Sequence, residues 1–464
     1  MGILSAIMVP HPPLILPPVG RGEEQKIQAT IDAYRQAARS IFEARPGTII
    51  LITPHSAIYA DWFHISPGPS AKGNFAQFGA GSLKVEARYD ETFVAELCAM
   101  AREVHLPAGT QGQQDAALDH ATMIPLHFLR EAFGTRPLPP IVRVGLAGLP
   151  LSEHYRLGML IRDTAGKLAR RVCVVASGDL SHRLKADGPY GFRPEGPQYD
   201  ERIMDVMGRA AFGELLDFSD TFCEAAGECG HRSFSILAGC FDGVAVDAKA
   251  LSYEGPFGVG YGVCVFTAGH KDDSRRYLDA ALAKQAQRLK EHVENEDAYV
   301  RLARLTVETY VTRGHPPKLP EGLPDDMTGR RAGVFVSLHK DGQLRGCIGT
   351  TSATTPSVAE EILQNAVGAC ARDPRFDPLT TQELPLLEYS VDVLGAAEPI
   401  ASPEQLDVKR YGVIVSSGRR LGLLLPDLDG VDTVEEQIAI AKRKAGIRPN
   451  EKVDLQRFEV VRHG

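Results

Sequence analysis

Apolar and polar positions alternate in two different rhythms along the first 270 residues of the chain. Apolar runs rich in Val and Ile and bounded by Gly or Pro are typical of buried strands, whereas apolar positions three and four residues apart are typical of helices. On this basis strands are predicted at 3–9, 48–56, 139–148, 170–182 and 258–269, and helices at 90–104 and 198–218. Strands that alternate with helices predict an α/β fold, with a mixed sheet and helices on both of its faces.

The pattern changes near residue 270. The segment that follows is polar at first and then strongly helical, which places a domain boundary near 268–276. Beyond this boundary, strands are predicted at 333–339, 343–350, 387–395 and 412–418, and a helix at 357–373. For a chain of 464 residues we therefore expect two domains, 1–270 and a smaller α+β domain over 277–464.

Composition narrows the class of protein. The opening run "ILSAIMVP" has no basic segment before it and is too short and too interrupted by prolines for a signal peptide or a membrane span, so no membrane association is expected. A formal net charge of −8 argues against a general nucleic-acid binder. The eight cysteines form no CxxC pair, which predicts reduced thiols in a cytoplasmic protein.

Three histidines lie where predicted strands end. His11 follows the first strand, and His55 and His182 end the strands at 48–56 and 170–182. Ligands of α/β proteins bind beyond the carboxyl ends of parallel strands, so these imidazoles are expected at one edge of the sheet. Each could instead be an unrelated surface or core histidine, but their shared placement favours a common metal site, since imidazole is the commonest nitrogen ligand.

Two imidazoles need a third ligand, which is usually anionic. Glu228 and Cys229 in "GECG" and Glu254 after a strand are the candidates. Two histidines and a carboxylate leave open positions on Fe(II) for substrate and dioxygen, whereas two histidines and a cysteine favour a softer or redox-tuned metal. The residues alone leave this choice open.

Two aspartates lie next to candidate histidines. Asp119 and His120 precede an apolar helical run, so Asp119 is either a helix cap or, with His120, part of the site. Asp179 lies three residues before His182, where it either orients an imidazole or closes a turn.

The ordered motifs "VPHPPLI", "TPHS", "LDHATMIPL" and "SGDLSHRL" resemble the LigB-like class III extradiol ring-cleavage dioxygenases and the related Memo family over about residues 3–267. The resemblance implies that His11 and His55 bind Fe(II) and that Glu228 is the matching carboxylate. Memo proteins carry a cysteine at that place, and Cys229 would match it instead.

The same resemblance assigns the remaining polar residues to substrate chemistry. His182 matches the acid/base histidine of the family, and His120 matches a histidine near substrate and oxygen, with Asp179 expected beside them. The implied function is an Fe(II)-dependent oxygenase that acts on a catechol-like or related small aromatic. The alternative is a Memo-like redox or scaffold protein that binds iron or copper without ring cleavage, and a zinc hydrolase is a weaker third option.

The motifs "LRGCIGT", "DPRFDPLTTQELPLLEYSVDVL" and "KRKAGI" resemble the AMMECR family over about residues 280–464. Gly346 and Gly349 bracket Cys347 in a predicted strand, where glycine often marks the close approach of a backbone or a ligand. Arg345 and Cys347 are thus expected to line a groove, unless Cys347 is only a small buried side chain. Because AMMECR, Memo and radical-SAM proteins recur as a set in prokaryotes, the resemblance also implies a radical-SAM protein as partner.

Overall fold

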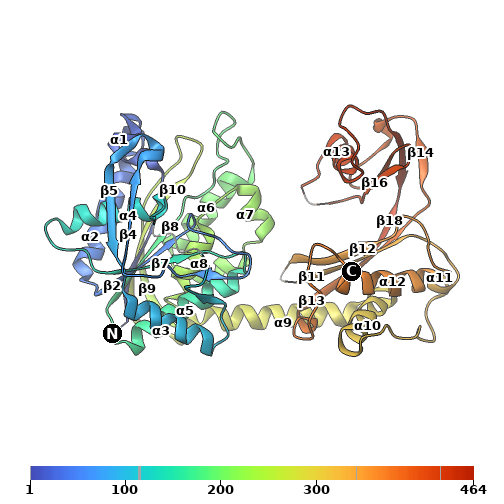
Figure 1. The fold of residues 1–464 in the computed structure, drawn as a ribbon, viewed down its shortest axis with the longest axis horizontal. Helices are drawn as coiled ribbons and strands as arrows, with labels where there is room; N and C mark the ends of the chain where they lie inside the picture. Colours follow the sequence, from blue (N-terminus) through green and yellow to red (C-terminus); the bar gives the residue numbers. More distant parts are fainter. Residues whose placement is uncertain (1, 113–116, 341, 429) are drawn as a thin grey trace. The chain divides into compact units, whose positions relative to one another are not determined.

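The structure is a computed structural model that describes residues 2–112, 117–340, 342–428 and 430–464. The chain divides into two compact units, Met1–Lys284 and Gln285–Gly464, each of which is visible in Figure 1. Helix α9 (Tyr277–Asn295) runs across this division. The boundary expected near 268–276 stays a prediction.

A six-stranded sheet forms the centre of the N-terminal unit. In spatial order its strands are β7 (Ile141–Gly145), β2 (Thr48–Thr53), β8 (Val172–Ser177), β1 (Ile3–Val9), β10 (Tyr261–Lys271) and β9 (Val244–Glu254). The first four are parallel, whereas β10 is antiparallel to β1 and β9 is antiparallel to β10. The mixed sheet predicted from the sequence is therefore confirmed.

Helices cover both faces of this sheet. One face packs against α3 (Glu91–Glu103), α5 (Leu151–Lys167), α6 (Glu195–Gly208) and α8 (His231–Gly239), and the other against α2 (Gln28–Ala44) and α4 (His120–Phe133). Alternate residues of one strand enter the two cores: Ile50 and Ile52 of β2 belong to the first, and Ile49 and Leu51 to the second. This double burial explains why the parallel strands are continuous apolar runs in the sequence.

One predicted helix differs from the structure. The pattern over 198–218 predicts a single helix, but α6 ends at Gly208 and the 3-10 helix η4 (Phe212–Asp217) follows. Between them Ala210 has a φ of 51°, a left-handed conformation that no α-helix contains. The remaining elements of the unit are short: η1 (Pro13–Ile15), α1 (Pro17–Gly20), η2 (Glu23–Ile27), β3 (Phe63–His64), β4 (Ser70–Phe75), η3 (Ala76–Phe78), β5 (Ala80–Arg88), β6 (Ala108–Gly109), α7 (Asp220–Ala226) and η5 (Asp273–Arg275).

Two four-stranded sheets form the C-terminal unit. The first contains β12 (Gln343–Gly349), β11 (Val334–Lys340), β13 (Leu387–Leu394) and β18 (Val460–His463), and packs against α10 (Ala298–Arg313) and α12 (Val358–Ala371). The second contains β14 (Glu398–Ile400), β17 (Asp454–Phe458), β15 (Gly412–Ser417) and β16 (Arg420–Leu424), and packs against α13 (Val434–Lys444). The short elements α11 (Asp325–Thr328), η6 (Leu384–Leu386) and η7 (Pro403–Gln405) complete the unit. Phe335 and Val460 of the first sheet pack with Ile414 and Phe458 of the second, which joins the two layers.

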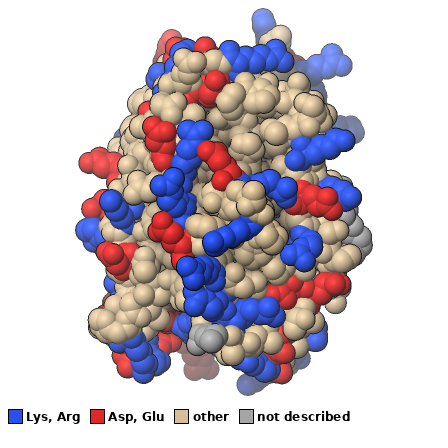
Figure 2. Space-filling view, turned by 90° about the vertical axis from the view of Figure 1, so that its left-hand side faces the viewer, with Lys and Arg blue, Asp and Glu red and all other residues tan. Residues whose placement is uncertain are grey.

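Two surface properties bear on the class of protein. Within the described ranges, no helix combines the length and the apolar character needed to cross a bilayer. On the face drawn in Figure 2, Lys and Arg side chains are interspersed with Asp and Glu side chains.

A close crossing of α5 and α8 provides a test of this packing. A Cβ at Gly158 would overlap the Ile236 carbonyl of α8, whereas a Cβ at Gly166 in the same helix would meet nothing within 4 Å. We expect Gly158→Ala to lower the free energy of unfolding by about 1–3 kcal/mol. Gly166→Ala should leave it unchanged or raise it by up to about 1 kcal/mol, because alanine favours the helix. Urea denaturation of both variants measures the difference, and equal effects would contradict the close crossing.

Candidate metal centre

The carboxyl ends of β1 and β2 bring His11 and His55 together. Each histidine is the second residue after its strand, and β8 lies between the two strands with Val9 paired to Ser177. The Nε2 atoms of the two imidazoles are 3.0 Å apart. The common edge predicted from the sequence is thus where these side chains meet.

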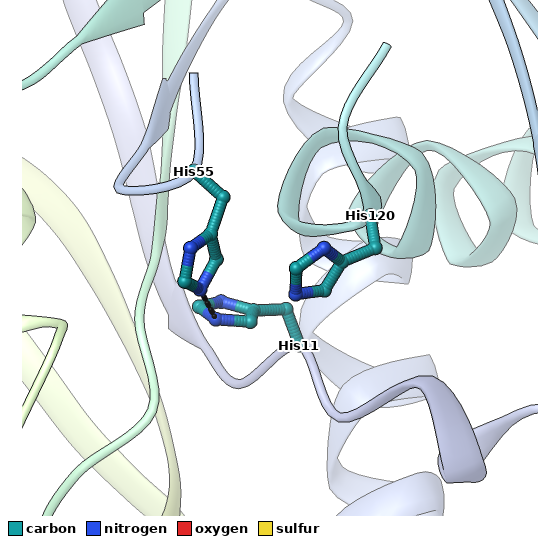
Figure 3. Close-up of side chains that lie close together, drawn as sticks. All are labelled: His11, His55 and His120. Carbon is teal, nitrogen blue, oxygen red and sulfur yellow. Dashed lines mark hydrogen bonds between the residues drawn. The ribbon is translucent and has the colours of Figure 1, made fainter. Parts of the chain in front are cut away.

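His120 completes a group of three imidazoles. It is the first residue of α4, and its ring stacks on that of His55 with 4.5 Å between the ring centroids. One ligand atom from each of His11, His55 and His120 lies within 4.8 Å of the others (Figure 3). This spacing is short enough for one ion to be held between them.

The last residue of β8 and the loop after it hold His11 in place. The Ser177 hydroxyl is hydrogen bonded to His11 Nδ1 at 3.0 Å, and the His11 backbone N–H donates to Asp179 Oδ1 at 2.7 Å. A bond at Nδ1 leaves Nε2 as the ligand atom, which is how second-sphere partners orient metal-binding histidines. Asp179 thus binds the backbone of His11 and holds in place the segment that carries the imidazole.

Asp119 forms a buried ion pair with Arg143 and also binds the segments that carry His55 and His120. Its Oδ1 accepts hydrogen bonds from the Thr53 hydroxyl at 2.8 Å and from the backbone at the start of α4, so the aspartate caps that helix. Its Oδ2 is 2.8 Å from Arg143 Nη2, and the two side chains are only 9% and 6% exposed. Burial alone would raise the pKa of Asp119, but Arg143 and these hydrogen bonds hold the pKa below its ordinary value.

The imidazoles of the centre are neutral near pH 7. Burial, with a contribution from His55, places the pKa of His11 well below its ordinary value and lowers that of His120 to about 4. Burial also lowers the pKa of His55, against the opposing charge of Asp119. Neutral imidazole is the form that binds metal ions, so at neutral pH these three groups need not lose a proton before they bind a cation.

The two glutamates considered as the third ligand serve other parts of the fold. Glu228, which the family resemblance implies as this ligand, accepts a hydrogen bond from His231 N–H at 2.6 Å at the start of α8. Glu254 accepts from the backbone and hydroxyl of Thr30 in α2, at 2.7 and 2.6 Å. The group of possible ligands contains His120 and neither glutamate. The physical reason is that a free helix N-terminus competes for a buried carboxylate.

Cys229, by contrast, faces the imidazoles. Its Sγ is 3.6 Å from His11 Nε2 and accepts a hydrogen bond from Asp179 N–H at 3.4 Å. A Cβ at Gly178 would overlap Gly230, so only glycine allows the two loops to approach this closely. Of the adjacent pair in "GECG", the structure therefore directs the thiol and not the carboxylate toward the centre.

His182 lies beside the three imidazoles without joining their group. Burial and the neighbouring His55 and Arg183 lower its pKa to about 4. Its Nε2 is buried and has no hydrogen-bond partner among the described residues, and its ring lies 5.1 Å from the ring of Tyr190. A buried nitrogen without a partner is costly, which suits a group that awaits a ligand. The donor set and this orphaned atom together fit a metal ion with a bound substrate.

Sequence reasoning missed the residues that hold these ligands in place. Ser177 lies inside the strand predicted over 170–182, where nothing marks it as a polar partner, and Arg143 lies in the buried strand β7. A charge inside an apolar run is a usable signal, because arginine is rarely buried without an acidic partner. Nothing in the sequence pairs Arg143 with Asp119, which is 24 residues away.

The buried ion pair can be tested by removing its acid. Asp119→Asn leaves the Arg143 charge buried and unpaired, so we expect a loss of about 3–5 kcal/mol in the free energy of unfolding. The control Asp32→Asn removes the exposed partner of Arg35 and should cost about 0.5 kcal/mol or less. Urea denaturation measures both values. Equal losses would show that Asp119 contributes no more than a surface charge.

Comparisons with known proteins agree with this architecture. A family model described as "Catalytic LigB subunit of aromatic ring-opening dioxygenase" matches residues 5–264, and a model described as AMMECR1 matches residues 300–463. Protein CA_C1420 of Clostridium acetobutylicum is 37% identical over 471 residues, which cover 100% of this chain and 99% of that protein. A protein of Thermotoga maritima is 49% identical over 170 residues, which cover 36% of this chain and 98% of that protein.

Among solved structures, the uncharacterized protein PH0010 from Pyrococcus horikoshii is 32% identical, covering 35% of this chain and 88% of that chain, with a TM-score of 0.34. The match of the ring-opening dioxygenase model spans most of the unit that contains the three imidazoles. The chain therefore belongs to the LigB family of aromatic ring-opening dioxygenase catalytic subunits through its N-terminal domain, and it carries an AMMECR1 domain after it.

Proposed function

We propose that the N-terminal domain is a non-haem Fe(II)-dependent oxygenase that acts on a catechol-like aromatic. The observation that carries the proposal is the convergence of His11, His55 and His120 at one edge of the sheet, with their ligand atoms within 4.8 Å. Membership of the ring-opening dioxygenase family supports iron as the metal and a small aromatic as the substrate. Copper and zinc are the alternatives that this nitrogen-rich donor set also accepts.

In this proposal His11 and His55 hold the metal, and His120 or Cys229 provides the third ligand. The carboxylate predicted at Glu228 is turned to α8, so the donors differ from a set of two histidines and one carboxylate. When bound, Fe(II) supplies open positions for the two catechol oxygens and for dioxygen. The protein supplies the orientation of its ligands through Ser177 and Asp119.

His182 is the base in this proposal. A catechol binds to a metal through deprotonated oxygens, so a neutral group must accept a phenolic proton as the substrate enters. The unpartnered Nε2 of His182 is such a group, and its low pKa keeps it unprotonated at neutral pH. The ring of Tyr190 lies against His182 and provides a flat wall for a planar substrate.

A second candidate function is favoured by Cys229. Its Sγ lies 3.6 Å from His11 Nε2, where a thiolate would tune the metal for redox chemistry instead of ring cleavage. This is the Memo-like alternative, an iron- or copper-binding protein that works with a radical-SAM partner. The AMMECR1 domain in the same chain supports a shared pathway for the two domains.

Cobalt binding distinguishes the third ligands. We expect Glu228→Gln to bind Co(II) as the unchanged protein does, because its carboxylate faces α8. Titration of anaerobically purified apoprotein measures the affinity, and a near-ultraviolet thiolate-to-cobalt band reports sulfur ligation. A band that Cys229→Ser abolishes supports the second candidate. Absence of the band, with weaker binding in His120→Ala, supports three imidazoles. A loss confined to Glu228→Gln would instead restore the carboxylate ligand.

The proposed base is tested by His182→Ala. We expect this variant to keep its iron but to lose turnover of a catecholic substrate by about 10²- to 10⁴-fold. Iron content and dioxygen consumption over a panel of catechols are the two measurements. The control His270→Ala removes an exposed imidazole of β10 and should change neither. Full turnover in His182→Ala would exclude this base, and no oxygen consumption by the unchanged protein would favour the second candidate.

A further inference from the structure

The segment that carries His182 has no regular secondary structure. Residues 178–183 follow the end of β8 and lie outside any helix or strand. The imidazole has no hydrogen-bond partner at Nε2 among the described residues, so its position depends on its backbone and on packing such as that against Tyr190. The contacts that fix this backbone therefore also fix the imidazole.

The residues before β10 hold one side of this backbone. Leu180 N–H donates to the Gly260 carbonyl at 2.9 Å, and Gly260 N–H donates to the Ser181 carbonyl at 2.8 Å. Ser181, the residue immediately before His182, is fully buried. Because a buried N–H requires an acceptor, the N–H of Ser181 must be satisfied by another part of the fold.

Asp200 of α6 is this acceptor. Ser181 N–H donates to Asp200 Oδ1 at 2.8 Å, and the Tyr253 hydroxyl of β9 donates to Asp200 Oδ2 at 2.7 Å. A Cβ at Gly260 would overlap Asp200 Oδ2, and a Cβ at Gly196 in α6 would overlap Ser181 Oγ. The carboxylate is thus fixed by close packing as well as by its two hydrogen bonds.

A carboxylate is a costly acceptor at this place. Asp200 is 1% exposed, and in the part of the chain that the structure describes no lysine, arginine or histidine is ion paired with it. Burial raises the pKa of Asp200 to about 7, whereas the buried Asp119 is paired with Arg143. Burial of an acid without a cation lowers stability. Asp200 is therefore better explained by the segment that it holds than by a contribution to the stability of the fold.

We propose that Asp200 is a positioning residue for the metal centre, which fixes the backbone before His182 through the Ser181 N–H and so holds the imidazole against the substrate. Tyr253 supports this role by binding the second carboxyl oxygen. The proposal rests on the proposed function, in which His182 accepts a phenolic proton. Proton transfer requires an acceptor within about 2.6–3.2 Å, so a displaced imidazole should slow the reaction without loss of the metal.

Asp200→Ala and Asp242→Ala form a matched pair of variants. Asp242 is also a buried aspartate that accepts from a tyrosine hydroxyl and a backbone N–H, those of Tyr155 and Tyr277, both at 2.9 Å. It precedes the first residue of β9, at the other end of that strand from the hydroxyl that Asp200 binds. Asp242→Ala therefore reports the effect of losing a buried carboxylate that does not contact residues 178–183.

NMR measures the position of the imidazole without reference to turnover. In apoprotein with carbon-13 in its histidine rings, His182→Ala identifies the signal of His182. We expect Asp200→Ala to shift and broaden this signal and Asp242→Ala to leave it unchanged. Thermal denaturation shows which variants are folded at the temperature of the measurement. A His182 signal that is the same in folded Asp200→Ala and in the unchanged protein would overturn the proposal.

Dioxygen consumption with a catechol measures the consequence for the reaction. We expect Asp200→Ala to lower kcat by about 10- to 100-fold at unchanged iron content, since a displacement of about 1 Å can cost about 10²-fold. Asp200→Asn should recover most of this loss, because its amide oxygen still accepts from Ser181 N–H and its NH₂ group can donate to the Tyr253 hydroxyl. When His182→Ala is already present, Asp200→Ala should cause little further loss, because two changes that act through one group are not additive.

Three results separate the alternatives. A loss from Asp200→Ala that is equally large with and without His182 would overturn the proposal, because the aspartate would then act elsewhere. If Asp200→Ala does not fold, Tyr253→Phe removes one donor to the same carboxylate, and an unchanged His182 signal in that variant would overturn the proposal. If the unchanged protein consumes no dioxygen with any catechol, the proposed function fails, and the NMR comparison still decides whether Asp200 positions His182.

Discussion

Burial of the parallel strands β1, β8 and β2 on both faces is the constraint on which the N-terminal unit depends. Strands covered by helices on either side end level with one another, and their first polar residues emerge at one edge. At that edge backbone and side-chain polar groups have little access to water, so each requires a partner inside the protein. Ser177, Asp179 and Asp119 provide these partners, and in doing so they orient His11, His55 and His120.

The same requirement explains why the acidic residues of the unit divide into different roles. A helix that begins near the buried edge exposes N–H groups, and a carboxylate within reach binds them in preference to a distant imidazole. Asp119 caps α4, and Glu228 accepts from the start of α8. The Cys229 thiol does not cap a helix in this way, and it faces His11. The side chains that face the three imidazoles are therefore those that are not bound to the N-terminus of a helix.

The C-terminal unit uses a buried carboxylate differently. Asp373 binds the backbone of Cys347 and the guanidinium of Arg375, so one acid fixes both the strand and the cation beside it. Glu383 likewise forms an ion pair with Arg345.

The sequence by itself determined the elements whose patterns are local. Continuous apolar runs identify buried strands such as β2 and β8. Their alternation with helices favours parallel neighbours, which places the histidines that follow them, His11 and His55, at one edge. The sequence did not determine the third ligand, since Glu228 and Cys229 are adjacent, and only their tertiary contacts, Glu228 with the start of α8 and Cys229 with His11, decide which one faces the imidazoles. Pairings between distant segments depend on packing that no local pattern encodes. Only the tertiary structure decided these pairings.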